Sequence, residues 1–161
     1  KILNYNFEDQ DLNILTERKY VQDNIYNFLN QKDNFILFHL DEKWIYDQYL
    51  KSYKVIEPNS YSSLVFFLEQ ISKKENIDLL ISSGNINNKF TEKFKSDFPE
   101  IHKNIYNFNN NKIFFLNHLT INQLEFAISK CSTFISCHGA PTHIAAAFNK
   151  KIIDIIDING Q

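Results

Sequence analysis

The stretch that decides the fold is CHGAPTHIAAA at residues 137–147. The apolar run STFIS at 132–136 precedes it, and KIIDII at 151–156 follows it. This order predicts a strand, a tight turn, a short alanine-rich helix and a second strand. Such a turn opens a helix at the carboxyl end of a parallel strand, where free backbone N–H groups and the helix dipole favour an anion. We therefore expect a site for a phosphate-bearing ligand at one edge of a sheet.

The rest of the chain alternates short apolar runs with amphipathic stretches. Their periodicity predicts further strands at 34–39, 77–82 and 112–116, and helices at 17–31, 60–74, 89–98 and 121–130. Thr120 is expected to cap the last of these helices. Strands that alternate with helices imply parallel βαβ units. We therefore predict an α/β fold: a Rossmann-like parallel sheet with helices on both faces, which binds ligands at the carboxyl ends of its strands.

Composition narrows the class of protein. The chain has 161 residues, 43% of them hydrophobic, which suits one folded domain with a real core. Its formal net charge is −2, and no basic stripe with interleaved aromatic residues occurs, which argues against nucleic acid as a partner. No apolar run approaches the roughly 18 residues of a membrane span, and no signal peptide is visible. Two cysteines without a disulfide or zinc pattern suit a reducing cytoplasm.

The two ends of the chain point to a piece of a longer protein. The chain begins at Lys1 and contains no Met, whereas a primary translation product starts with Met. It stops at Gln161, just after a predicted strand. We expect an N-terminal helical or linker segment at residues 1–33, followed by a Rossmann-like domain at residues 34–161. A homodimer could cover an apolar face that a missing half leaves exposed.

Residues 139–143 are the first candidates for the anion site. Gly139 can adopt a positive φ or allow close approach of the backbone, and Pro141 suits the first helical turn. In the functional interpretation, a diphosphate is held by backbone N–H groups of the turn, which are those of Gly139, Ala140, Thr142 and His143. In the simpler interpretation, the turn needs Gly and Pro for its geometry alone. The sequence leaves both interpretations open.

Two histidines flank this turn. His138 and His143 lack a third metal ligand with convincing spacing, although Cys137 is adjacent, so we expect no metal site. His143 lies one turn into the predicted helix, where it could bind a phosphate oxygen or lock the turn. For His138, a structural hydrogen bond is the competing interpretation.

Polar residues also follow two earlier strands, at the same predicted edge. Lys43 comes after the first strand and carries a compact charge suited to a diphosphate, unless it is a solvated loop lysine. Ser83 and Gly84 follow the second strand. They could contact a ribose or a base, or form a plain polar loop.

These pieces, in this order, resemble the C-terminal half of the heptosyltransferase family, glycosyltransferase family nine. The resemblance runs from Phe35 to Asp157, and its most specific part is HGAPTHIAAA at 138–147. The family signature there has the form Asp-Ser/Thr-Gly-x-x-His-Leu/Ile-x-Ala-Ala. His138 stands where the family has its Asp, and Ala140 stands where it has its Gly. The weaker matches are Lys43-Trp44, Gly84 and Leu119-Thr120.

The resemblance implies a nucleotide-sugar-binding domain, one half of a two-domain glycosyltransferase fold. It implies the donor-binding part of an inverting enzyme of surface glycan or lipopolysaccharide synthesis, in the cytoplasm or at the inner face of the membrane. The donor would be a nucleotide-sugar such as an ADP-sugar, and the acceptor a glycan or a lipid-linked molecule, with no cofactor.

The resemblance also implies roles by position. Lys43 would meet the phosphates, and the turn at 139–142 with His143 would hold the diphosphate. Ser83, Gly84 and His138 complete the predicted donor-binding set. The family's catalytic base lies in the N-terminal half, so no catalytic residue is assigned in this chain.

Two other functions fit the sequence. A non-catalytic Rossmann-like module could use the same fold to bind a partner or a glycan, and His138 in place of the family's Asp favours it. An unrelated Rossmann-like enzyme is the third possibility, although no Gly-rich dinucleotide fingerprint, P-loop or GxSxG motif occurs. An upstream half with an acidic residue at its cleft would favour the transferase.

Overall fold

A buried central strand, β1 (Phe35–Leu40), organises the sheet. The computed structural model describes residues 24–32, 34–40, 61–75, 77–84, 89–102, 104–108 and 111–155. The other strands are β2 (Asp78–Ser83), β3 (Glu100–His102), β4 (Ile105–Phe108), β5 (Asn111–Leu116), β6 (Thr133–Cys137) and β7 (Lys151–Ile155). The helices are α2 (Asn24–Asn30), α4 (Tyr61–Glu75), α5 (Lys89–Asp97), α6 (Ile121–Lys130) and α7 (Ala140–Ala147).

The strands form one sheet in the order β3-β4-β5-β2-β1-β6-β7. Strands β1, β2, β5, β6 and β7 run parallel, whereas β3 and β4 join the β5 side as an antiparallel extension. The chain moves outward from β1 through β2 to β5, and then returns to place β6 and β7 on the other side of β1. The strand order therefore reverses between β1 and β6, the topological switch point at which open α/β sheets bind ligands.

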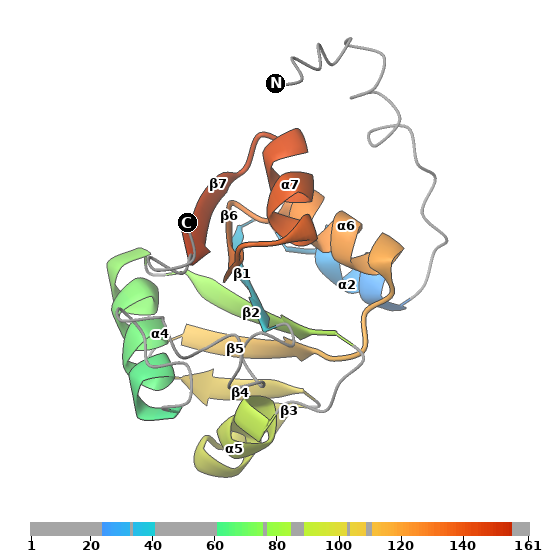
Figure 1. Ribbon diagram of the computed structural model, residues 1–161. Helices are drawn as coiled ribbons and strands as arrows, with labels where there is room; N and C mark the ends of the chain where they lie inside the picture. Colours follow the sequence, from blue (N-terminus) through green and yellow to red (C-terminus); the bar gives the residue numbers. More distant parts are fainter. Residues whose placement is uncertain are drawn as a thin grey trace, which may run out of the picture.

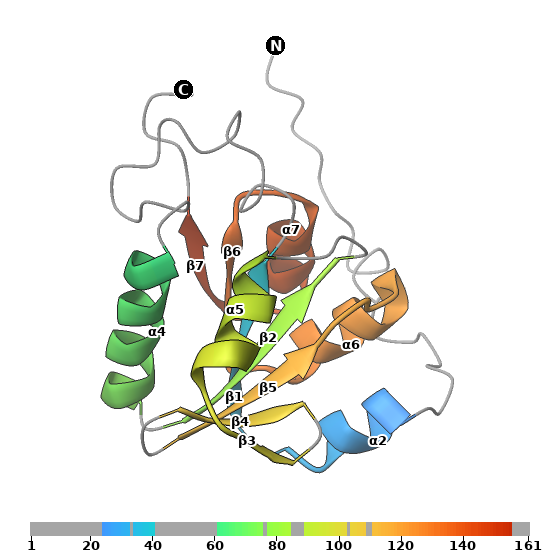
Figure 2. The same ribbon diagram turned by 90° about the horizontal axis from the view of Figure 1, so that it is seen from below.

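Helices cover both faces of the sheet, because alternate side chains of each strand point in opposite directions. Phe35 and Leu37 pack with residues of α2, α6 and α7. Ile36 and Phe38 pack on the other side, with residues of α4 and α5. Figures 1 and 2 show α4 on one side of the sheet and α2 and α6 on the other. Because both faces are covered, every residue of β1 is buried.

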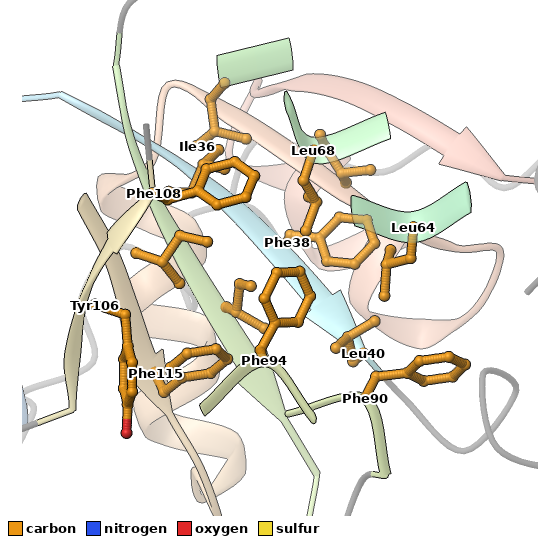
Figure 3. Packing of buried hydrophobic residues seen from close by; sticks show 14 of the residues in the cluster. Ile36, Phe38, Leu40, Leu64, Leu68, Phe90, Phe94, Tyr106, Phe108 and Phe115 are labelled. Carbon is orange, nitrogen blue, oxygen red and sulfur yellow. The ribbon is translucent and has the colours of Figure 1, made fainter. Parts of the chain in front are cut away.

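Phe94 on α5 joins that helix to the antiparallel part of the sheet. Its ring centroid lies 5.2 Å from that of Tyr61 on α4, 6.3 Å from Phe108 on β4 and 6.1 Å from Phe115 on β5. The Phe94 side chain is fully buried, and Figure 3 shows its ring at the centre of the cluster. Aromatic pairs at these separations add to the stabilisation that comes from burial. Phe94 thus ties β4 and β5 to α4 and α5.

The predicted α/β fold is confirmed. The predicted strands, and the helices predicted at 60–74, 89–98 and 121–130, are present within a few residues of their expected ends. Of the helix predicted at 17–31, α2 covers residues 24–30, and residues 17–23 lie outside the described residues. Thr120 caps α6 as expected: its hydroxyl accepts from the Gln123 amide, and the Gln123 side chain accepts from the Thr120 amide. The sheet is mixed rather than wholly parallel, because β4 pairs antiparallel with both β3 and β5, and neither β3 nor β4 was predicted. Within the described ranges, none of the helices has the length and apolar character needed to span a bilayer.

Replacing Phe94 by Ala should lower the free energy of unfolding by about 3–5 kcal/mol, because it leaves a cavity among several rings. Urea denaturation measures the change. Phe94→Leu should give a smaller loss in the same direction if the Ala variant does not fold. Phe66 is 62% exposed on α4, so Phe66→Ala should stay within about 0.5 kcal/mol of the native chain. Equal losses for Phe94→Ala and Phe66→Ala would contradict the packing described here.

The Cys131 thiol at the end of α6 should resist alkylation in the native protein. Its Sγ donates to the Ile128 carbonyl at 3.2 Å, and burial raises its pKa from 9.0 to about 12, opposed in part by Lys150. The folded thiol therefore keeps its proton to higher pH than the unfolded thiol. The free energy of unfolding should then fall as pH rises above 9.0, more steeply than in Cys131→Ala. Rapid reaction of native Cys131 with a thiol reagent at pH 8 would contradict this.

Candidate functional site at the carboxyl edge of the sheet

The turn between β6 and α7 lies at the switch point of the sheet. β1 ends at Leu40 and β6 ends at Cys137, and these two strands are hydrogen-bonded neighbours. His138 and Gly139 follow β6, and α7 begins at Ala140. The helix thus starts at the switch point, the place in open α/β sheets where ligands bind.

The backbone of this turn bears on the two roles that the sequence left open for Gly139. Its φ is 173° and its ψ is −170°, which is extended backbone, so Gly139 does not supply a positive φ. α7 begins at Ala140, which makes Gly139 the N-cap residue, and N-cap residues are usually extended. Pro141 lies in the first turn, as predicted.

Only part of this turn can offer N–H groups to an anion. The His138 amide donates to the Ile155 carbonyl at 3.0 Å, and the Thr142 amide donates to the Gly139 carbonyl at 3.0 Å. Pro141 has no N–H. Within the described residues, the amides of Gly139 and Ala140 make no such backbone hydrogen bond. These two amides are therefore the ones best able to bind an anion at the start of α7.

Asp154 on β7 connects the residues around the turn. Its Oδ2 lies 2.5 Å from His138 Nδ1, and its Oδ1 accepts from the Thr142 hydroxyl at 3.3 Å. A carboxylate can only accept, so Nδ1 of His138 carries the proton in this contact. The ring of His143 meets that of His138 edge-on, with centroids 5.5 Å apart. The Asp154 carboxylate thus orients both the His138 ring and the first turn of α7. The His143 ring packs against the His138 ring that Asp154 holds.

Asp154 is also the end of a polar row across the sheet. Strand register aligns Ser82 with His39, His39 with Ser136, and Ser136 with Asp154. Their neighbours along the strands place this row on the face covered by α6 and α7. Ser82, His39 and Ser136 are buried, and His39 Nδ1 lies 2.9 Å from Ser82 Oγ. Buried polar side chains in mid-sheet are uncommon, and here they lie one residue before the strand ends of β1, β2 and β6.

The structure gathers most of the predicted site residues at one edge. His138 and His143 are exposed, Gly139 and Pro141 are half-buried, Ala140 is exposed, and Thr142 is buried. Ser83 and Gly84 end the β2 segment at the same edge, with β1 between them and β6. The Ser83 hydroxyl donates to Asn117 Oδ1 at 3.3 Å, and a Cβ added at Gly84 would meet nothing within 4 Å. Lys43 and Trp44 lie outside the described residues.

Sequence reasoning gave Asp154 and His39 no role. A signal for Asp154 was present, because it is a lone charge inside the apolar run IIDII at 152–156. A charge in such a strand costs free energy unless it is paired, so it calls for a partner nearby. The partner of His39 depends on strand register, which the local sequence does not carry.

The Cys137 side chain faces away from this cluster, although its carbonyl accepts from the Ser136 hydroxyl at 3.0 Å. Its side chain is fully buried in the apolar cluster on the α4 and α5 face of the sheet, whereas Asp154 and Ser136 point to the other face. In the part of the chain that the structure describes, no three His, Cys, Asp or Glu side chains are placed to hold a metal ion.

Two solved structures share this fold. One is the UDP-GlcNAc 2-epimerase of Methanocaldococcus jannaschii in complex with UDP-GlcNAc and UDP, with a TM-score of 0.55 and 14% sequence identity. The other is the ADP-heptose LPS heptosyltransferase II of E. coli, with a TM-score of 0.52 and 10% identity. The similarity covers 90% and 85% of this chain, but only 35% and 38% of those chains. Neither a protein-family model nor a curated protein matches the sequence.

Replacing Asp154 by Ala should lower the free energy of unfolding by about 1–3 kcal/mol, because the buried Thr142 hydroxyl loses its acceptor. Asp154→Asn keeps an acceptor oxygen for Thr142 and should cost less. Urea denaturation measures both changes.

Glu92→Ala is the matched control for the Asp154 variants. The Glu92 side chain is 68% exposed and pairs with Lys95 on the surface of α5, so its loss should change stability by less than about 0.5 kcal/mol. If Asp154→Ala were no more damaging than Glu92→Ala, Asp154 would not hold the turn together.

Proposed function

We propose that this domain binds the diphosphate of a nucleotide-sugar at the turn between β6 and α7, as the donor-binding part of a glycosyltransferase. The observation that carries the proposal is the coincidence of three features at the sheet's switch point. These are the amides of Gly139 and Ala140, the exposed imidazoles of His138 and His143, and the buried polar row beneath them. Each can bind or orient a phosphate oxygen, and a helix N-terminus adds a favourable dipole.

The charges at the turn favour a ligand whose negative charge is divided between two neighbouring groups. Asp154 brings a carboxylate within 2.5 Å of His138, so a protonated His138 forms a neutral pair with it. His143 then supplies the further positive charge when it is protonated. A diphosphate can place one phosphate at the amides of Gly139 and Ala140 and the other near His143. Lys43 follows the end of β1 by three residues, and we propose that it contacts the same phosphates.

The fold supports the choice of a nucleotide-sugar over other diphosphates. The two similar solved chains are an epimerase that is bound to UDP-GlcNAc and UDP, and an ADP-heptose heptosyltransferase. We propose that Ser83 and Gly84 contact the nucleoside, because they lie at the same edge and the space beside Gly84 is open. Hydrogen bonds to the diphosphate would stabilise it as it leaves the anomeric carbon during inverting transfer. The acceptor would be a glycan or a lipid-linked molecule in surface glycan or lipopolysaccharide synthesis.

Titration of the purified chain with ADP, GDP and UDP at millimolar levels tests the proposal. At least one nucleotide should bind and shift the backbone NMR signals of Gly139, Ala140 and His143. His143→Ala should weaken binding roughly tenfold, as expected for loss of a charge-assisted hydrogen bond. His118→Asn is the matched control: His118 is an exposed histidine in the turn that follows β5, and its φ of 57° suits Asn. The control should bind as the native chain does.

Two results would overturn the proposal. Binding that is equally weakened in His143→Ala and His118→Asn would remove the β6–α7 turn from the site. Failure of all three nucleotides to bind would favour a second function, that of a non-catalytic module that binds a partner or a glycan. The partly buried Asp154 carboxylate favours this alternative, because its negative charge lowers the positive potential beside the turn.

A further inference from the structure

A cavity lies on the face of the sheet that α2 covers, beside β5 and the antiparallel strands. It has a volume of about 370 Å³ and lies between α2, β3, β4 and β5. Figure 2 shows α2 close to β3 and β4. We call it the Lys32–Lys112 cavity, and its lining is Phe28, Gln31, Lys32, Ile101, Ile105, Lys112 and Phe114. A cavity of this size suits a small organic molecule.

One ammonium of the cavity is held in place by its surroundings. Lys32 Nζ lies 3.8 Å from the centroid of the Phe114 ring and 5.4 Å from that of Phe28. It also pairs with Asp78 Oδ2 at 3.4 Å, and the Lys32 side chain is only 22% exposed. A cation over two ring faces gains electrostatic attraction and loses little freedom when a ligand arrives.

The charges of the described residues at the cavity do not cancel. Asp78 is occupied on both oxygens, since Oδ2 pairs with Lys32 and Oδ1 accepts from the Lys112 backbone amide at 3.3 Å. Within the described ranges, the Lys112 ammonium contacts no carboxylate. Lys32, Lys112 and Asp78 together therefore leave one net positive charge beside apolar walls. Such a site attracts a single negative charge attached to an apolar body.

We propose that the Lys32–Lys112 cavity binds a small aromatic monoanion, a carboxylate or a sulfonate. The anionic group would lie between the two lysines, and the ring would lie against Phe28, Ile105 and Ile101. Ile101 is 53% exposed, and a bound ring would cover part of that surface. Inorganic phosphate would leave these apolar walls unused, and a folded peptide would exceed the volume. The site is separate from the β6–α7 turn, because β2 and β1 lie between β5 and β6 in the sheet.

Fluorescence titration with 1-anilinonaphthalene-8-sulfonate tests the proposal on the native chain. The dye should bind saturably at one site, and salicylate should displace it while phosphate at equal ionic strength does not. Lys112→Glu reverses the unpaired charge and should weaken dye binding at least tenfold. Gln31→Glu adds a carboxylate at an exposed lining position and should also weaken it.

Lys73→Glu is the matched control, because Lys73 is an exposed lysine on α4, on the far face of the sheet. It should leave dye affinity unchanged, and each variant should unfold in urea with the cooperativity of the native chain. Equal weakening by Lys73→Glu and Lys112→Glu, or dye binding without saturation, would overturn the proposal. Binding of nucleotides should be unchanged in Lys112→Glu, which separates this site from the proposed donor site.

Discussion

One carboxylate in an apolar edge strand holds the candidate site together. Asp154 lies on β7, and its two oxygens bind the first turn of α7 through Thr142 and the residue after β6 through His138. Three elements therefore converge on a single side chain. A charge in such a strand is costly unless it is paired, and these partners offset that cost. The direction of the His138 ring, and with it the packing of His143, depends on this arrangement.

On one face of the sheet, the buried side chains change from apolar to polar just before the carboxyl ends of the strands. Over most of their length, β1, β2 and β6 carry the large apolar side chains that fill the two cores. The row of Ser82, His39, Ser136 and Asp154 then replaces those side chains with polar ones on one face. Buried hydrogen-bonded groups of this kind fix geometry more strictly than apolar contacts do. The floor of the candidate site is therefore more rigidly specified than its rim.

Apolar periodicity was enough to predict the fold class and the parallel strands. It missed β3 and β4, because they have only three and four residues and are held by contacts with α5 and β5. The alternation of Ile105, Tyr106, Asn107 and Phe108 has the period of a strand, but it is too short to stand out. Residues 138–143 were predicted as the segment that forms the candidate site. The hydrogen bonds of Asp154 and His39 around that segment were not predicted. Which side chain meets Asp154 or His39 depends on strand order and register, and these arise only in the assembled sheet.

The antiparallel extension places the short strand β3 at one edge of the sheet. β3 has only three residues, and its pairing with β4 shifts register between Glu100 and His102. A short, irregular strand beside a charged Glu100 offers few aligned N–H and C=O groups to another chain. A sheet that ended at β5 would present a six-residue strand with an apolar centre instead. The small extension thus protects this border of the domain against unwanted strand pairing between molecules.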